Sequence, residues 1–201
     1  MSAPQDVGDA RPADLIVIGC SAGGPPALLE ILPRLPRGTT TAILVAQHMP
    51  GRFTTLFAER LARLCPLPVS EPKDGDRLLP GTICIAAGGR QTTLDRLPPG
   101  IVFHVRPRGP AERYAPSADL LMVSAAELFG PRSLGILMTG MGGDGVEGLR
   151  AIKDRRGRTI AESEETAAVF GMPREAIRAG LADLVLPRSE IALEMARRCR
   201  R

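Results

Sequence analysis

Continuous apolar runs alternate along the first part of the chain with segments in which apolar residues recur at helical spacing. The run Leu15–Gly19 is apolar throughout, and after a turn rich in Gly and Pro the segment Pro26–Leu35 carries Leu and Ile at helical spacing. The run Thr41–Gln47 is followed in the same way by Phe53–Leu64. Each pair predicts a buried strand, a tight turn and a helix that packs against the strand.

The same texture returns in the second half of the chain. The expected elements are helices that begin near Ser117, Val146, Pro173 and Glu190, and strands over Ser133–Thr139, Arg158–Glu162 and Leu181–Pro187. Strands that are apolar on both faces belong to parallel sheets covered by helices on both sides. We therefore expect an α/β fold with a doubly wound, mainly parallel sheet and helices on both faces.

The stretch from residue 66 to residue 109 has a different texture. Short runs such as Thr82–Ala87 and Ile101–Val105 are separated there by Asp-Gly, Pro-Gly and Gly-Gly dipeptides, which favour tight turns. We expect short strands that include a small β-hairpin insertion. No internal repeat or linker interrupts the 201 residues, a length that suits one domain.

Composition narrows the class of protein. No apolar run reaches the ~18–20 residues that cross a bilayer, and the first dozen residues lack the apolar stretch of a secretory signal. We therefore expect a cytoplasmic protein with no membrane insertion. The four cysteines are far apart and form no C-x-x-C pair, which is typical of reduced thiols.

The charged residues limit the partners and ligands. Of the 26 basic residues only Lys73 and Lys153 are Lys, so the rest are Arg; codon bias and a surface that faces acidic partners both remain open as reasons. The one dense basic run is the C-terminal tail, and five Phe and one Tyr leave little for base stacking, so nucleic acid is not expected as a partner. Two histidines exclude a multi-histidine metal site.

Polar residues follow three of the predicted strands: Ser21, His48 and Asp144. In doubly wound sheets ligands bind at the carboxyl ends of the strands, so these residues are candidates for one site. The segment Gly19–Gly23 matches G-x-S-x-G between a strand and a helix, where a sharp turn exposes a serine hydroxyl as nucleophile. The alternative is that Ser21 only caps the helix that follows.

His48 and Asp144 complete the candidate constellation. His48 is either a general base that reaches Ser21 across adjacent strands or a satisfied polar group at a strand end, whereas His104, inside a short strand, is interpreted as structural. Asp144 lies in the glycine turn Gly140–Gly145 at the start of a helix. It is either the carboxylate that orients the histidine in a Ser-His-Asp triad or an N-cap.

The glycine turn also supports a rival function. Gly140, Gly142 and Gly145 satisfy G-x-G-x-x-G between a strand and a helix, and three glutamates, Glu162, Glu164 and Glu165, follow about twenty residues later. This pattern is typical of a dinucleotide site. Against it, Asp144 inside the turn would repel a pyrophosphate.

Six stretches in order along the chain carry a resemblance to a known family: IVIGCSAGG, VAQHMPGRFTTLFAERL, PGTICIAAGGR, YAPSADLLMVSAA, GILMTGMGGDGVEGL and FGMPREAIRAG. On these motifs the chain resembles the catalytic domain of chemotaxis receptor protein-glutamate methylesterases of the CheB type. The resemblance implies a nucleophile at Ser21, a general base at His48, an orienting acid at Asp144 and a site methionine at Met141. The backbone N–H of Ala22, directly after the nucleophile, is the expected oxyanion donor.

The resemblance implies an activity and partners. Such an enzyme hydrolyses glutamyl 5-O-methyl esters on chemoreceptor cytoplasmic helices and releases methanol, and many members also deamidate receptor glutamines; neither metal nor cofactor is needed. Because receptor helices are rich in Glu, Arg106 and Arg108 are expected at the rim of the substrate site. The alternatives are a serine esterase for another ester, or a nucleotide-binding or non-catalytic module that uses the turn Gly140–Gly145.

The family usually carries a phosphorylatable receiver domain before the esterase. Here residues 14–198 are expected to form the catalytic domain and residues 1–13 a short extension, which leaves no room for a receiver in this chain. Regulation by a receiver or histidine kinase in trans, a stand-alone enzyme and a fragment all remain open. Ala22 also departs from the family, whose members often have Thr after the nucleophile.

Overall fold

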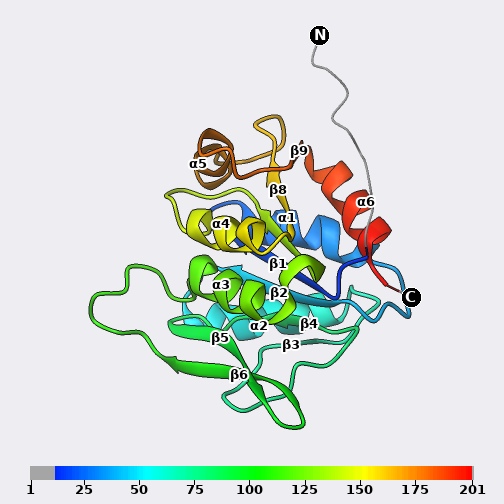
Figure 1. Ribbon diagram of the computed structural model, residues 1–201, viewed down its shortest axis with the longest axis vertical. Helices are drawn as coiled ribbons and strands as arrows, with labels where there is room; N and C mark the ends of the chain where they lie inside the picture. The colour runs from blue at the N-terminus through cyan, green and yellow to red at the C-terminus, as the bar shows by residue number, and fades with distance from the viewer. Residues whose placement is uncertain (1–11, 201) are drawn as a thin grey trace.

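The computed structural model describes residues 12–200, in which seven strands form one parallel sheet in the order β3-β4-β2-β1-β7-β8-β9 (Figure 1). Every pairing in this sheet is parallel. The strands are β1 (Leu15–Cys20), β2 (Ala42–Gln47), β3 (Val69–Ser70), β4 (Ile83–Ile85), β7 (Ser133–Leu137), β8 (Arg158–Glu162) and β9 (Leu184–Leu186). The expected doubly wound parallel sheet is confirmed.

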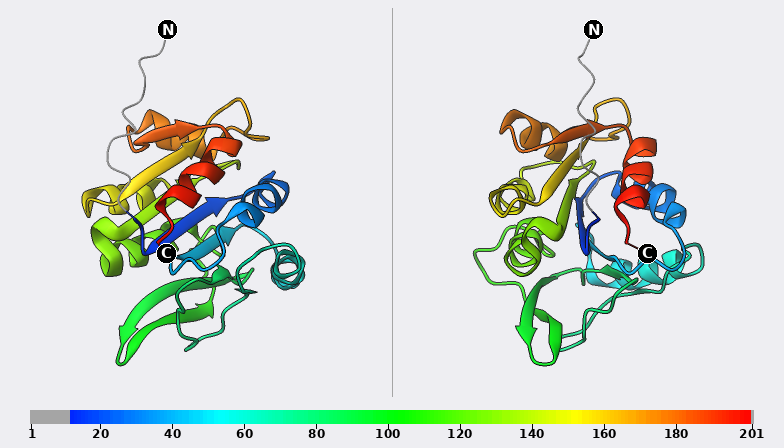
Figure 2. Two further views of the ribbon diagram at one scale, coloured as in Figure 1. Left: turned by 90° about the vertical axis from the view of Figure 1, so that its right-hand side faces the viewer. Right: turned by 45° about the vertical axis from the view of Figure 1, so that its right-hand side comes forward.

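Helices cover both faces of the sheet. The right-hand view of Figure 2 shows α3 and α4 on one side and α1 and α6 on the other. Side chains of α2 join the core formed with α1 and α6, and those of α5 join the core formed with α3 and α4. The helices are α1 (Gly24–Ile31), α2 (Gly51–Ala62), α3 (Ala118–Phe129), α4 (Val146–Asp154), α5 (Met172–Arg178) and α6 (Arg188–Arg198), with 3₁₀ turns at Leu32–Arg34 and Gly130–Arg132.

The apolar sequence of β1 follows from this double cover. All six residues of β1 are buried. Ile16 and Ile18 pack into the core of α1 and α6, whereas Leu15 and Val17 pack into the core of α3 and α4. A strand with two covered faces needs apolar residues at odd and even positions alike, which is the pattern of a central parallel strand.

The hairpin lies outside the main sheet. Strands β5 (Arg90–Leu97) and β6 (Gly100–Pro107) pair antiparallel and form a two-stranded sheet of their own, as expected for a small insertion. Their apolar side chains Leu94 and Phe103 belong to the core beneath α3. The Leu94 N–H donates to the Ser124 hydroxyl of α3 at 3.0 Å, which ties the hairpin to that helix.

The structure bears on two further expectations, the reduced cysteines and the short N-terminal extension. Cys20, Cys84 and Cys199 are buried, Cys65 is half-buried, and all four are free thiols. The expected extension of residues 1–13 lies outside the described residues except at its last two positions. Within residues 12–200 no helix is long and apolar enough to cross a membrane.

The order of the strands creates a crevice at the carboxyl edge. From β1 the chain first builds the sheet outward through β2 to β4 and β3, and it later returns to the other side of β1 to place β7, β8 and β9. The loops after β1 and β7 therefore leave the sheet in opposite directions. This switch point is where doubly wound folds bind their ligands.

Candidate active site

Ser21 and His48 are neighbours at the carboxyl edge of the sheet. Ser21 directly follows β1 and His48 directly follows β2, and the register pairs Cys20 with Gln47 at the ends of these strands. The His48 N–H donates to the Cys20 carbonyl at 3.1 Å, which extends the pairing by one residue. The two residues therefore lie side by side at the ends of adjacent strands.

Asp144 contacts the histidine from the turn after β7. Its Oδ2 lies 2.7 Å from His48 Nε2, and the exposed fractions are 14% for the histidine side chain and 2% for the aspartate side chain. An ionised carboxylate only accepts hydrogen bonds, so His48 Nε2 carries the proton and donates it. In the neutral imidazole Nδ1 is then the acceptor nitrogen, free to take a proton.

The N-terminus of α3 surrounds the Asp144 carboxylate with donors. Asp144 accepts from the Ser117 hydroxyl at 2.8 Å, from the Ala118 N–H at 2.7 Å and from the Asp119 N–H at 3.1 Å. Burial acts to raise the pKa of Asp144, but the hydrogen bonds from His48, Ala118 and Ser117 outweigh it and the pKa is lowered. The carboxylate is therefore ionised at neutral pH.

The alternative in which Asp144 is the N-cap of α4, the helix that follows it, is wrong. The N-cap of α4 is Gly145, and Asp144 instead binds the first N–H groups of α3. Asp119 of α3 does the reverse: its Oδ1 accepts from Gly145 N–H at 2.8 Å and from Gly148 N–H at 2.7 Å. The two carboxylates thus exchange helices, an arrangement that we call the cross-cap, and it holds the turn that carries Asp144.

Replacing Asp119 with Asn should change how stability depends on pH. Burial and the negative charge of Asp144 raise the pKa of Asp119 from 3.8 to about 6. The folded state then binds a proton more readily than the unfolded state, so the wild type gains stability as pH falls through 6, and the gain is complete below 3.8. Because Asp119 is half-buried, we expect a gain of about 1 kcal/mol relative to Asp119→Asn.

Urea unfolding of both proteins between about pH 7 and pH 4.5 measures this difference. Asn keeps the oxygen that accepts from the two N–H groups of α4, so the comparison isolates the charge. A stability difference that stays constant over this range would contradict the raised pKa.

The alternative in which Ser21 caps α1 is wrong. The N-cap of α1 is Gly23, and no side chain caps that helix. The backbone of Ser21 is fixed instead, because its N–H donates to the Thr139 carbonyl and its own carbonyl accepts from Gln47 Nε2 at 2.9 Å. Within residues 12–200 neither the Ser21 hydroxyl nor the Ala22 N–H has a hydrogen-bond partner, so both are available to a ligand.

The glycines around Ser21 allow close packing of the two turns. Gly23 has a φ of 81°, and a Cβ there would lie 2.6 Å from the Ala168 side chain. A Cβ on Gly140 would lie 2.3 Å from Met172 Sδ and 2.8 Å from Ser21 Cβ. Only glycine fits either position, and the turn that carries Asp144 consequently lies directly against Ser21.

Two residues of the site escaped the sequence interpretation. Gln47 is buried at the end of β2, and its Nε2 donates to the carbonyls of both Ser21 and His48. Tyr114 stacks on His48 with ring centroids 4.7 Å apart and an angle of 10° between the planes. The only sequence signal for Tyr114 was its place at the start of the matching stretch YAPSADLLMVSAA.

The remaining candidate residues differ in their exposure and in their partners. Met141 is 77% exposed in the turn next to Gly140, where a ligand at Ser21 could touch it.

Arg106 forms a two-pronged ion pair with Glu112. The pKa of Glu112 falls to about 2 because of the hydrogen bonds from Arg106 and from the Gly109 N–H. Arg108 is exposed and has no ion-pair partner within residues 12–200. His104 lies exposed on β6, with Nδ1 3.1 Å from Asp74, and does not contact the site.

The requirements of a dinucleotide site are not met by the glycine turn. A pyrophosphate needs free N–H groups at the helix N-terminus, but Asp119 already occupies those of Gly145 and Gly148. Glu162, which would have to bind a ribose, is fully buried and accepts from Thr139 N–H and Arg188. The residues that matched the pattern therefore hold the fold of the turn.

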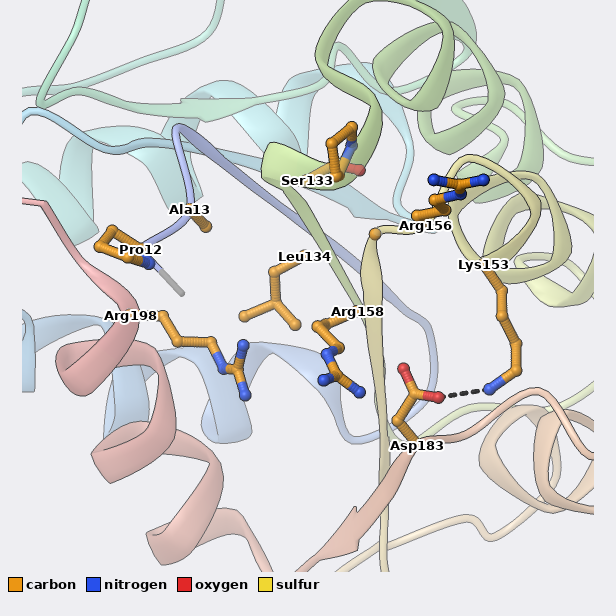
Figure 3. A pocket seen from close by; sticks show the side chains of 11 residues that line it. Pro12, Ala13, Ser133, Leu134, Lys153, Arg156, Arg158, Asp183 and Arg198 are labelled. Atoms are coloured by element: carbon orange, nitrogen blue, oxygen red, sulfur yellow. Dashed lines mark hydrogen bonds and ion pairs between the residues drawn. The ribbon is translucent and has the colours of Figure 1, made fainter. Parts of the chain in front are cut away.

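A separate cavity of about 330 Å³ lies at the opposite, amino-terminal edge of the sheet (Figure 3). Lys153, Arg158 and Arg198 line it, and Lys153 pairs there with Asp183. This cavity begins at the first residues of β7 and β8, on the side away from Ser21, His48 and Asp144. No cluster of three or more His, Cys, Asp or Glu side chains suited to a metal ion occurs within residues 12–200.

Comparison with known proteins agrees with this geometry. The family model described as CheB methylesterase matches residues 16–195. A protein-glutamate methylesterase/protein-glutamine glutaminase of Geobacter sulfurreducens is 46% identical over 94% of this chain and 52% of its own length, and one of Myxococcus xanthus is 43% identical over 95% and 55%. The chain spans about half the length of these curated relatives.

The fold matches a solved structure of the same type. The Thermotoga maritima CheB methylesterase catalytic domain superposes with a TM-score of 0.88 at 36% sequence identity, over 92% of this chain and 97% of that one. The family match over residues 16–195 contains β2, β7, all of β1 except Leu15, and the three candidate residues at the ends of these strands. The chain therefore belongs to the CheB methylesterase family.

Proposed function

We propose that this chain is a protein-glutamate methylesterase domain that hydrolyses glutamyl 5-O-methyl esters on the cytoplasmic helices of chemoreceptors. The observation that carries the proposal is the 2.7 Å hydrogen bond between His48 and the buried Asp144, beside Ser21 at the end of the adjacent strand. The names of the relatives support the choice of ester, and they add glutamine deamidation as a second activity. Its place of action would be the cytoplasm, where those helices lie.

The first half-reaction forms an acyl-enzyme. Ser21 Oγ attacks the ester carbonyl while His48 Nδ1 takes its proton, and Asp144 stabilises the imidazolium that forms. The Ala22 N–H, which no described residue occupies, donates to the oxyanion of the tetrahedral intermediate. His48 returns the proton to the methoxy oxygen, the C–O bond breaks and methanol leaves. Ser21 then carries a glutamyl ester.

The second half-reaction restores the enzyme. Water attacks the Ser21 ester while His48 takes one of its protons, and His48 returns that proton to Ser21 Oγ as the acyl–oxygen bond breaks. The glutamyl carboxylic acid that leaves gives up its proton to solvent. A glutamine side chain would form the same acyl-enzyme with ammonia as the leaving group. No step requires a metal or an organic cofactor.

The boundaries and partners follow from the same proposal. Residues 14–198 serve as the catalytic domain, and a receiver or a histidine kinase acting in trans would control it. Met141 and the Gly140–Gly145 turn would contact the substrate beside Ser21. The cross-cap and Gln47 would hold the acid, the nucleophile and the base in register.

Methanol release from methylated receptor helices tests the proposed function. Purified protein is incubated with a methylated chemoreceptor cytoplasmic fragment and, separately, with a small aryl ester. Release of methanol at a rate well above that of the substrate alone supports the methylesterase. Hydrolysis of the aryl ester without methanol release would instead assign a serine esterase for another ester.

Reversing the charge of Arg108 should weaken binding of the receptor substrate. Arg108 is the exposed rim arginine without an ion-pair partner in the described chain, and Arg108→Glu would repel a Glu-rich helix. We expect KM for the receptor fragment to rise about tenfold, while turnover of the aryl ester is unchanged.

Arg155→Glu is the matched control for that variant. Arg155 is exposed at the end of α4, on the opposite edge of the sheet, and the substitution changes the net charge equally. An equal rise of KM in both variants would show that net charge, not a local rim, attracts the substrate. An equal loss on both substrates would place Arg108 outside the rim.

A further inference from the structure

Tyr114 covers one face of the His48 imidazole. The ring centroids are 4.7 Å apart and the planes are 10° from parallel, so the two rings are stacked nearly parallel. The hydrogen bond to Asp144 fixes the position of Nε2, but it allows the imidazole to rock about that point because the χ2 torsion of histidine is broad. A ring stacked on one side of the imidazole opposes this rocking on that side.

Tyr114 is itself held on several sides. Its backbone carbonyl accepts from Gln91 Nε2 at 2.7 Å, and Gln91 is 1% exposed. Gln91 Oε1 in turn accepts from the N–H of Ser117, whose hydroxyl donates to Asp144. One buried amide therefore anchors both the residue that stacks on the base and a residue that binds the acid.

The ring of Tyr114 is bounded on its other sides as well. The guanidinium of Arg113 lies 5.3 Å from the ring centroid. The hydroxyl reaches the glycine turn, where a Cβ on Gly142 would lie 2.4 Å from it. A bulkier residue at position 142 would clash with the Tyr114 hydroxyl, so the turn leaves room for the ring in its present position.

We propose that Tyr114 is a positioning residue that holds the His48 imidazole with Nδ1 directed at Ser21. This inference rests on the proposed esterase function, since His48 must act as the base for its orientation to matter. Tyr114 does not touch the reacting atoms in this role. Its aromatic ring, rather than its hydroxyl, supplies the effect.

The chain is unusually suited to a direct test. His48 is one of two histidines, and Tyr114 is the single tyrosine. In protein labelled with ¹⁵N-histidine, a His104→Gln background leaves one imidazole signal, that of His48. The Nε2–H of His48 is hydrogen-bonded to the Asp144 carboxylate, whose side chain is 2% exposed. This proton should therefore exchange slowly with water, and its signal should be visible in the wild type.

Two substitutions separate the ring from the hydroxyl. Tyr114→Phe keeps the stack, and we expect kcat within about twofold of wild type and an unchanged His48 signal. Tyr114→Leu removes the stack, and we expect kcat to fall about tenfold with KM within about twofold, together with broadening of the His48 N–H signal. Rates are measured on the aryl ester and on the receptor fragment.

Phe129→Leu is the control for a merely structural role. Phe129 is also half-buried, but it lies at the far end of α3, away from His48. It should lower the melting temperature without changing kcat or the His48 signal. The proposal is overturned if Tyr114→Leu leaves kcat and the signal unchanged, if Tyr114→Phe loses as much as Tyr114→Leu, or if Phe129→Leu has the same effects.

The outcome is independent of the identity of the ester. If the receptor fragment is not a substrate but the aryl ester is, the same comparison of kcat applies to the aryl ester. If neither ester is cleaved, the proposed function fails, and the His48 signal alone decides whether Tyr114 orders the imidazole: broadening in Tyr114→Leu and not in Tyr114→Phe supports it, and no change contradicts it.

Discussion

Replacement of Ser21 by Ala is expected to lower methanol release from methylated receptor helices by roughly five to six orders of magnitude, which is loss of activity in practice. The substitution removes the hydroxyl oxygen that would form the proposed acyl-enzyme, and Ser21 is the residue that follows β1 beside His48 at the end of β2. The Ser21 hydroxyl makes no hydrogen bond to any described residue, so the free energy of unfolding should change by less than about 0.5 kcal/mol.

Ser163→Ala is the matched control for this loss. The Ser163 hydroxyl is also without a hydrogen-bond partner within residues 12–200, and it follows β8 at the same edge of the sheet. This variant should release methanol at the wild-type rate. Measurable turnover by a folded Ser21→Ala protein would show that another group is the nucleophile.

Replacement of Asp144 by Asn should reduce kcat by about four orders of magnitude while the protein still folds. An amide can turn its NH₂ group toward His48 Nε2, which would then have to accept a hydrogen bond, so that the imidazole proton would lie on Nδ1. In that tautomer Nδ1 cannot take the proton of Ser21. The lowered pKa of the native carboxyl is the opposite condition, because it keeps Asp144 ionised and Nε2–H donating.

Stability separates this effect from the loss of a cap. Asp144 also accepts from Ser117 and from the first N–H groups of α3, so Asp144→Asn should cost about 1–2 kcal/mol of unfolding free energy. Asp183→Asn is the control, because Asp183 is a hydrogen-bonded carboxylate at the opposite edge of the sheet. It should lose stability and keep its kcat. If both variants lost activity only in proportion to their unfolded fraction, Asp144 would have no catalytic role.

The main sheet could be predicted because its strands are simple in sequence. Strands β1, β2 and β7 are buried along their whole length and appear as largely apolar runs, whereas β8 is mixed in sequence although four of its five residues are buried. Strand β5 (Arg90–Leu97) was not anticipated, because six of its eight residues are polar or charged and its order comes from pairing with β6 and packing on α3. The strand expected over Leu181–Pro187 is limited to Leu184–Leu186.

The position of the site could be predicted, but its internal support could not. Strand ends converge in any parallel sheet, so the order of the elements alone was enough to name Ser21, His48 and Asp144 as candidates for one site. The exchange of carboxylates between α3 and α4 depends on how the two helices pack, and the bonded residues are separated by 26 positions in the sequence. Likewise, the pairing of Arg106 with Glu112 depends on the course of a loop, which composition does not specify.

The cross-cap makes Asp144, the acid of the proposed triad, dependent on two helices at once. Asp144 binds the start of α3 and Asp119 binds the start of α4, so neither helix is completed at its N-terminus unless the other is docked. Hydrogen bonds that are shared in this way should open and close together, as one cooperative unit in amide hydrogen exchange. A molecule in which this unit is open would then lack the candidate site entirely, rather than keep a less active form of it. Activity should disappear in a single step with this pair of helices, even where the rest of the sheet persists.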